Sequence, residues 1–159
     1  MSPHSIYTVR FPDCDPFGHL NNARYIDYFL NAREDHLRDA FGIELHTYAR
    51  QGVGWVVSGH QIQYLRPAAY NEQVRIESDL IEAGDSNLLV ELRMYSADGR
   101  QLKAVLWSQF TCIDPKTGKK QKHPEHFAAL ASSLVIQGIK TSDGFDGRVA
   151  GLVSAIKPF

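Results

Sequence analysis

One long amphipathic segment followed by several strand-like segments most constrains how this chain can fold. From Asn21 or Asn22 to Phe41, apolar residues recur every three to five positions with charged residues between them, which predicts a helix with one apolar side. Gly42 follows where a left-handed residue would end that helix. A helix of this kind needs a second layer to bury its apolar side. The chain must therefore also build a sheet that lies against a single long helix.

Strand patterns supply that sheet. One segment before the helix is rich in β-branched and aromatic residues, and four segments after it alternate in polarity or are apolar throughout. Asp98-Gly99 predicts a type I′ hairpin between the last two strands. The order strand, long helix, four antiparallel strands is typical of an α+β domain. We expect a curved antiparallel sheet of about five strands, at residues 5–11, 53–65, 72–83, 87–96 and 102–113.

Two of these strands sort apolar and charged side chains onto opposite faces, because successive residues of a strand point to opposite sides. The apolar face takes Val74, Ile76, Leu80, Leu88, Val90, Leu92 and Met94. The charged face takes Arg75, Glu77, Asp79, Glu91 and Arg93.

The residues beyond the last strand are predicted to add two short helices. The segment 124–130 has proline in its first turn, as short helices often do. We divide the chain into a domain at 1–131 and a C-terminal extension at 132–159, in which a loop precedes a short amphipathic helix. That helix should pack on the domain, and a lid over a binding tunnel or an oligomer contact is the alternative. Its apolar residues fall at helical spacing: Val149, Leu152, Val153 and Ile156.

Composition excludes several classes of protein. The 159 residues suit one domain, and a net charge of −1 gives no sign of a nucleic-acid or membrane partner. Cys14 and Cys112 form neither a disulfide framework nor a CxxC motif, which favours a reducing cytoplasm. No apolar run is long enough to cross a bilayer, and residues 1–10 lack the features of a secretory signal. His123 and His126 have ligand-like spacing but no third partner in the sequence, so we expect no metal.

The residues just before the long helix are the best suited to chemistry. Asp15 is followed by a proline, a glycine, a histidine and two asparagines. Free backbone N–H groups and a partial positive charge at a helix start can hold a developing oxyanion. A carboxylate just upstream can attack an acyl carbon or activate water. Taken singly, these residues also fit an ordinary turn and helix cap.

Taken together, Gly18-His19-Leu20-Asn21-Asn22-Ala23-Arg24-Tyr25 resembles the signature of the hotdog-fold acyl-CoA thioesterases of the 4-hydroxybenzoyl-CoA thioesterase-like group. It is most similar to the branch that hydrolyses fatty acyl-CoA. The resemblance continues from Val56 to Leu80, including Tyr64-Leu65-Arg66-Pro67-Ala68, and covers about the first four-fifths of the chain. It implies a hotdog fold and a homodimer, with acyl-CoA sites at the subunit interface and in many members a homotetramer. A sheet with exposed edges and an uncovered face independently favours dimerisation.

The resemblance also implies roles for individual residues. Asp15 is the catalytic carboxylate, acting as nucleophile or as general base, and the backbone N–H of Asn22 is the oxyanion donor. Asn stands at this position where some relatives carry His or Tyr, so no side-chain role is assigned to it. His19 is a further catalytic candidate, which donates to the carbonyl, tunes Asp15, or only orders the turn. The expected substrate-binding residues are Gly18, Asn21, Tyr25, His60 and Arg66, although capping is the more ordinary role for Asn21.

The expected reaction is hydrolysis of a medium- to long-chain acyl-CoA to free acid and CoA, with no cofactor beyond the CoA of the substrate. Arg66 or a lysine cluster could meet the CoA phosphates, although short lysine runs usually coat surfaces. The alternatives are an aryl-CoA or acyl-carrier-protein thioesterase, and a non-catalytic module that binds acyl thioesters. The cluster comprises Lys116, Lys119, Lys120 and Lys122.

Overall fold

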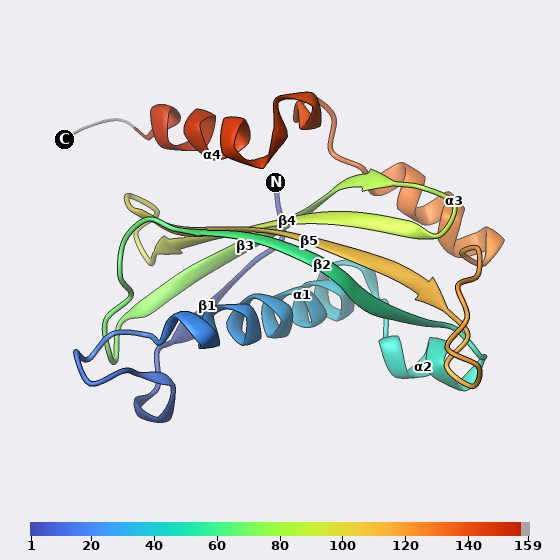
Figure 1. Cartoon of the computed structure of the whole chain (residues 1–159), viewed down its shortest axis with the longest axis horizontal. Coiled ribbons are helices and arrows are strands. Elements are labelled where there is room, and N and C mark those ends of the chain that lie inside the picture. Colours follow the sequence, from blue (N-terminus) through green and yellow to red (C-terminus); the bar gives the residue numbers. More distant parts are fainter. Residues whose placement is uncertain (157–159) are drawn as a thin grey trace.

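A five-stranded antiparallel sheet with one long helix on its inner face forms the body of the protein (Figure 1). This computed structural model describes residues 1–156, so the last three residues of the predicted extension lie outside the described residues. The strand order is β1-β3-β4-β5-β2, and the α+β architecture predicted from the sequence is confirmed. The strands are β1 (His4–Thr8), β2 (Gly54–Tyr64), β3 (Gln73–Ala83), β4 (Asn87–Ser96) and β5 (Leu102–Ile113).

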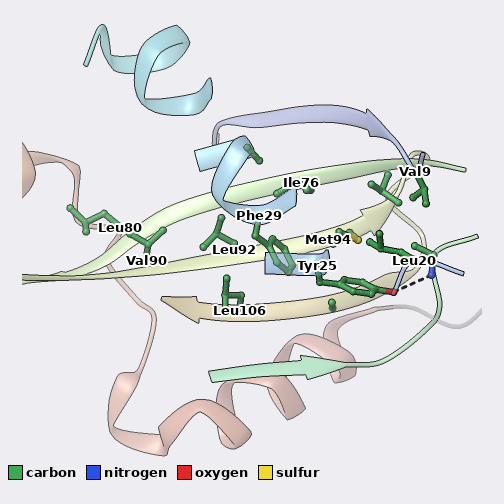
Figure 2. Close-up of a cluster of buried hydrophobic side chains, with 14 of the residues drawn as sticks. Val9, Leu20, Tyr25, Phe29, Ile76, Leu80, Val90, Leu92, Met94 and Leu106 are labelled. Carbon is green, nitrogen blue, oxygen red and sulfur yellow. Dashed lines mark hydrogen bonds between the residues drawn. The ribbon is translucent and has the colours of Figure 1, made fainter. Parts of the chain in front are cut away.

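The long helix α1 (Tyr25–Phe41) begins and ends as the sequence predicts. A 3₁₀ turn, η2 (Asn22–Arg24), leads into it, and Gly42 ends it with a left-handed φ of 65°. Its buried side, which includes Tyr25 and Phe29, packs against the apolar face of β3, β4 and β5 (Figure 2). Burial of each such side chain is worth about 1.5–3 kcal/mol, so this contact fixes the helix on the sheet.

The C-terminal helix α4 (Gly144–Ala155) packs on the opposite face of the sheet from α1 (Figure 1). Phe145 and Val149 lie against Val105 and Trp107 of β5 in a second apolar cluster. The helix therefore packs on the domain, and the outer face of the sheet is not left uncovered as the sequence suggested. In residues 1–156 no helix is both long and apolar enough to span a membrane.

A buried ionic network lies between α4 and the sheet. Glu91 is fully buried and accepts hydrogen bonds from Nε and Nη2 of Arg148 at 2.8 and 2.9 Å. It also accepts from Arg93 at 2.6 Å and from the Trp107 indole at 3.0 Å. Burial alone would raise the pKa of Glu91, but these donors and cations outweigh burial and lower the pKa. The alternating polarity of β4 predicted that Glu91 lies on the outer face of the sheet. Its burial depends on α4, which packs on that face.

Two turns differ from the sequence prediction. β1 ends at Thr8 and not at residue 11, because Pro12 lies in a 3₁₀ turn, η1 (Phe11–Asp13). The turn between β4 and β5 is not type I′, which requires a positive φ at both central residues. Asp98 has no positive φ, and its carboxylate instead accepts from the Ser96 hydroxyl and the Arg100 amide.

Two short helices complete the described chain. The helix α2 (Leu45–Arg50) was not predicted from the sequence. The helix α3 (Glu125–Leu134) follows Pro124 as predicted but runs four residues past 130. A 3₁₀ turn, η3 (Thr141–Asp143), leads into α4.

Replacing Arg148 with alanine should lower the free energy of unfolding by about 1–3 kcal/mol, because Glu91 then loses two of its buried donors. Urea unfolding of Arg148→Ala and of the wild type measures this difference. Arg24→Ala is the matched control, since Arg24 and its partner Asp27 are both more than half exposed. The control should change stability by less than about 0.5 kcal/mol. Equal losses in both variants would mean that the buried network does not hold α4.

Candidate functional site

The loop that carries Asp15 is pinned to the chain between β2 and β3. The Leu20 amide donates to the Ala68 carbonyl at 2.8 Å, and the Tyr70 amide donates to the Gly18 carbonyl at 2.8 Å. A backbone bridge joins His19 to the same segment at Ala69. These bonds hold the loop in one position directly before the helix start.

The Asp15 carboxylate is held by one oxygen and free at the other. Its Oδ1 accepts from the Phe17 amide at 2.9 Å and from the His19 amide at 3.2 Å. Among the described residues, Oδ2 has no hydrogen-bond partner. Because Oδ1 is anchored by two rigid backbone donors, Oδ2 has a defined direction, as a nucleophile or general base requires.

Pro16 and Gly18 shape the turn around this carboxylate. The Gly18 amide donates to the Asp15 carbonyl at 3.1 Å, which closes a tight turn with Pro16 in its second position. Gly18 has a φ of 76°, a conformation that favours glycine. An added Cβ there would meet no protein atom within 4 Å. Within the described residues, glycine is therefore needed at this position for its backbone angle.

The helix start lies next to this turn. The Asn21 side chain accepts from the Ala23 amide at 2.9 Å, which is the capping role that the sequence favoured. The Asn22 amide has no acceptor among the described residues, as expected for the first N–H of a helical turn. Its carbonyl accepts from the Tyr64 hydroxyl at 2.8 Å, so the end of β2 is tied to the helix start.

The predicted site residues fall into two groups. Asp15, Gly18, His19, Asn21 and Asn22 come together in the loop and helix start, and the His19 side chain is exposed there. The remaining three predicted residues lie in neighbouring elements: Tyr25 begins α1, Arg66 lies in the segment between β2 and β3, and His60 lies on β2.

Tyr25 is buried, and its hydroxyl accepts from the Ala68 amide at 3.2 Å (Figure 2). It therefore anchors the helix start to the segment between β2 and β3, and its ring lies inside the core. A role for Tyr25 in substrate binding stays a prediction. Arg66 is exposed in the segment after β2. His60 lies four residues before Tyr64 on β2, about 13 Å away along the strand. Its Nδ1 is buried without a partner, and burial lowers the pKa of His60.

An apolar cavity of 340 Å³ lies between the second half of α1, the inner face of the sheet and α3. On α1 it begins at Leu30, about 8 Å past the helix start. It therefore lies beyond the first turn of α1, whereas the Asp15 loop lies before the helix start. Val57 of β2 lines it and is 41% exposed, so the cavity reaches the free edge of the sheet. The helix α4 is on the other face and is not a lid over this cavity.

Aromatic and aliphatic side chains from seven elements form the cavity wall. Trp55 and Val57 of β2 both line the cavity, whereas Gly59 of the same strand does not. Most of the other lining residues were recognised only as core positions or not at all. They include Leu37, Leu45, Leu80, Leu88, Val90, Phe110, Phe127, Leu130, Ala131 and Leu134.

Next to the cavity lies a buried polar cluster that sequence reasoning missed. The Arg33 guanidinium donates to the Ser78 hydroxyl at 2.9 Å, and the His36 Nδ1 is 2.7 Å from the same oxygen. Burial lowers the pKa of Arg33 to about 10. Burial, reinforced by the charge on Arg33, lowers the pKa of His36 to about 4. The signal in the sequence was weak: an arginine and a histidine three residues apart on the apolar side of a helix.

The two histidines with ligand-like spacing lie among aromatic rings. The Trp55 indole donates to His123 Nδ1 at 3.2 Å, and the ring of His126 stacks on Tyr48 with centroids 5.7 Å apart. These contacts hold the segment before α3 against the start of β2, and α3 against α2.

Comparisons with known proteins agree with this architecture. A family model described as the thioesterase-like superfamily matches residues 9–130. The long-chain acyl-CoA thioesterase FadM of Escherichia coli is 32% identical over 112 residues, covering 70% of this chain and 83% of FadM. The acyl-CoA thioesterase YbgC of Haemophilus influenzae is 25% identical, covering 79% and 91% respectively. A hypothetical protein, TT1821 from Thermus thermophilus, superposes with a TM-score of 0.76 at 25% identity, covering 84% and 99%. The hotdog fold implied by the sequence is confirmed.

The buried His36 should make stability depend on pH. Its folded pKa of about 4 lies below its ordinary value of 6.5, so the unfolded chain binds a proton in this interval that the folded chain does not. The free energy of unfolding is therefore unaffected by this group above pH 6.5. It falls by about 2–3 kcal/mol as the pH is lowered to 4. Urea unfolding at pH 7, 5.5 and 4 measures it.

His36→Asn should lose less stability over that pH range than the wild type does, because it removes the titrating group. His46→Asn is the control, since His46 is 63% exposed, and it should keep the wild-type pH dependence. Identical pH profiles for His36→Asn and the wild type would rule out this role for His36.

Proposed function

Because the chain belongs to the thioesterase-like superfamily, we propose that it hydrolyses medium- to long-chain acyl-CoA with Asp15 as its catalytic carboxylate. The observation that carries this proposal is the Asp15 carboxylate itself. One oxygen is fixed by two backbone N–H groups and the other is free, directly before a helix start. The apolar cavity supplies a water-poor space for a hydrocarbon chain. The relative FadM, named a long-chain acyl-CoA thioesterase, supports the choice of acyl group.

The chemistry follows from these positions. Asp15 Oδ2 either attacks the thioester carbonyl carbon, giving a mixed anhydride that water then cleaves, or deprotonates a water that attacks the same carbon. In both routes negative charge builds on the carbonyl oxygen, and the Asn22 amide would donate to it. The C–S bond then breaks and CoA leaves as a thiolate, which needs little protonation because a thiol is a far stronger acid than an alcohol. Water supplies the new oxygen of the free acid.

The free edge of β2 favours a homodimer that completes the site. Among residues 1–156, β2 pairs with β5 alone, and Val56 and Val57 on it are 43% and 41% exposed. Such an edge is a template for pairing with another strand. In a two-fold dimer the two β2 strands would run antiparallel, so the end of one lies opposite the start of the other.

This pairing would bring Asp15 of one subunit to the cavity of its partner. Tyr64, at the end of β2, is bonded to Asn22 beside the Asp15 loop. Trp55 and Val57, at the start of β2, line the cavity. The exposed lysine cluster at 116–122 follows β5, next to the start of β2. It would then lie near the partner's Asp15 loop, where the CoA phosphates could meet it.

Asp15→Asn should lower kcat by about a hundredfold or more, since it removes the nucleophile or base at nearly constant size. The assay is release of free thiol from a panel of acyl-CoAs, from acetyl to palmitoyl and including benzoyl. Asp27→Asn is the control, because Asp27 is an exposed carboxylate in the first turn of α1 whose ion-pair partner is the exposed Arg24 and not the Asp15 loop. Wild-type turnover by Asp15→Asn would disprove the catalytic assignment. A wild type inactive on the whole panel would instead favour carrier-protein thioesters or a non-catalytic binding module.

Mixed dimers test whether the site is shared between subunits. Leu130→Trp should fill the cavity from α3 and, like Asp15→Asn, should be inactive by itself. Co-expression of the two differently tagged variants should restore about a quarter of wild-type activity, because half of the dimers are mixed and each has one intact site. No recovery in purified mixed dimers would mean that Asp15 and the cavity act within one subunit.

A further inference from the structure

The apolar cavity contains a buried cation at its inner wall. Arg33 lines this cavity and also a second cavity of 480 Å³ between α1, β3 and the segment after α3. The Arg33 side chain is therefore part of the wall of both spaces, and its hydrogen-bond partner Ser78 lines the second. Only 8% of Arg33 is exposed, so bulk water does not solvate its charge as it would on the surface.

Among the described residues this cation has no paired carboxylate. Its one hydrogen bond goes to the neutral hydroxyl of Ser78, although a guanidinium carries five N–H donors. The negative charge of Asp79 favours the charged form of Arg33. Asp79 itself, however, is bound to Arg93 at 2.7 Å on the outer face of the sheet. A buried charge without a partner is costly, and proteins usually pair it. Glu91, by contrast, is a buried charge that accepts hydrogen bonds from three side chains.

We propose that Arg33 binds the terminal carboxylate of an ω-carboxyacyl group, so that the substrate is the CoA monothioester of an α,ω-dicarboxylic acid. The choice of a thioester rests on the proposed function above. The thioester would lie at the cavity mouth on β2, the methylene chain along the apolar wall, and the far carboxylate at Arg33. The fork of a guanidinium matches a carboxylate in a bidentate pair.

The other polar groups near Arg33 agree with an anionic ligand. The Ser78 hydroxyl accepts from the guanidinium and also contacts His36, and neither side chain adds a negative charge. Glu34 also lines the cavity, but it is exposed, and water screens an exposed charge far more than a buried one. A neutral acyl chain would leave the remaining N–H donors of Arg33 without an acceptor. A site rejects an analogue that lacks a polar group in this way.

Turnover by the wild type gives the first test and needs no variant. Thiol release is measured for even-numbered ω-carboxyacyl-CoAs from octanedioyl to hexadecanedioyl, each beside the acyl-CoA of the same length. At the length that reaches Arg33, kcat/KM for the diacid thioester should exceed that of its neutral partner by about tenfold or more. Shorter diacid thioesters should be poor substrates, because their charge would stop in the apolar part of the cavity. Absence of any length at which the diacid is preferred would overturn the proposal.

Direct binding separates this inference from the proposed function. Calorimetry compares dodecanoate with methyl dodecanoate, probes that share a chain and differ in charge. The wild type should bind the acid about tenfold more tightly, Arg33→Lys should keep part of the difference, and Arg33→Met should lose it. Thermal melting confirms that each variant folds. Equal binding of acid and ester by the wild type overturns the carboxylate site, even if neutral acyl-CoAs are hydrolysed. Charge-dependent binding without hydrolysis of any thioester supports the carboxylate site and counts against the proposed function.

Discussion

The packing of one side of α1 against the inner face of the sheet is the contact on which the rest of the structure depends. Tyr25 and Phe29 bury the first turns of the helix, and the Tyr25 hydroxyl is bonded to the segment between β2 and β3. The same segment pins the Asp15 loop. Removing the helix from the sheet would therefore also release the carboxylate, so fold stability and site geometry share one set of contacts.

The two ends of α1 serve different purposes. Its start presents free N–H groups beside a fixed carboxylate, whereas its second half leaves the sheet far enough to form a cavity with α3. A helix of 17 residues is about 25 Å long, so these two parts are separated within one chain. Pairing of β2 edges in a dimer is a direct physical way to join them, because antiparallel strands place opposite ends side by side.

The two faces of the sheet treat buried charge differently. On the outer face, Glu91 and Arg93 are compensated by each other and by Arg148, which makes α4 an integral part of the domain. On the inner face, Arg33 meets only a neutral hydroxyl and two cavities. A compensated network stabilises a fold, and an uncompensated cation beside a cavity is suited to a ligand of opposite charge.

The sequence by itself determined the order of elements, the long helix with its Gly42 end, the inward face of β3 and β4, and the reactive turn at Asp15. These features are local: they follow from side-chain period, turn chemistry and helix capping within a few residues. Only the tertiary structure decided that Tyr25 is a core anchor, that Glu91 is buried, and that Arg33 borders a cavity. Burial depends on what packs on a residue from distant parts of the chain, and a side-chain period reveals which face a residue occupies but not what covers that face.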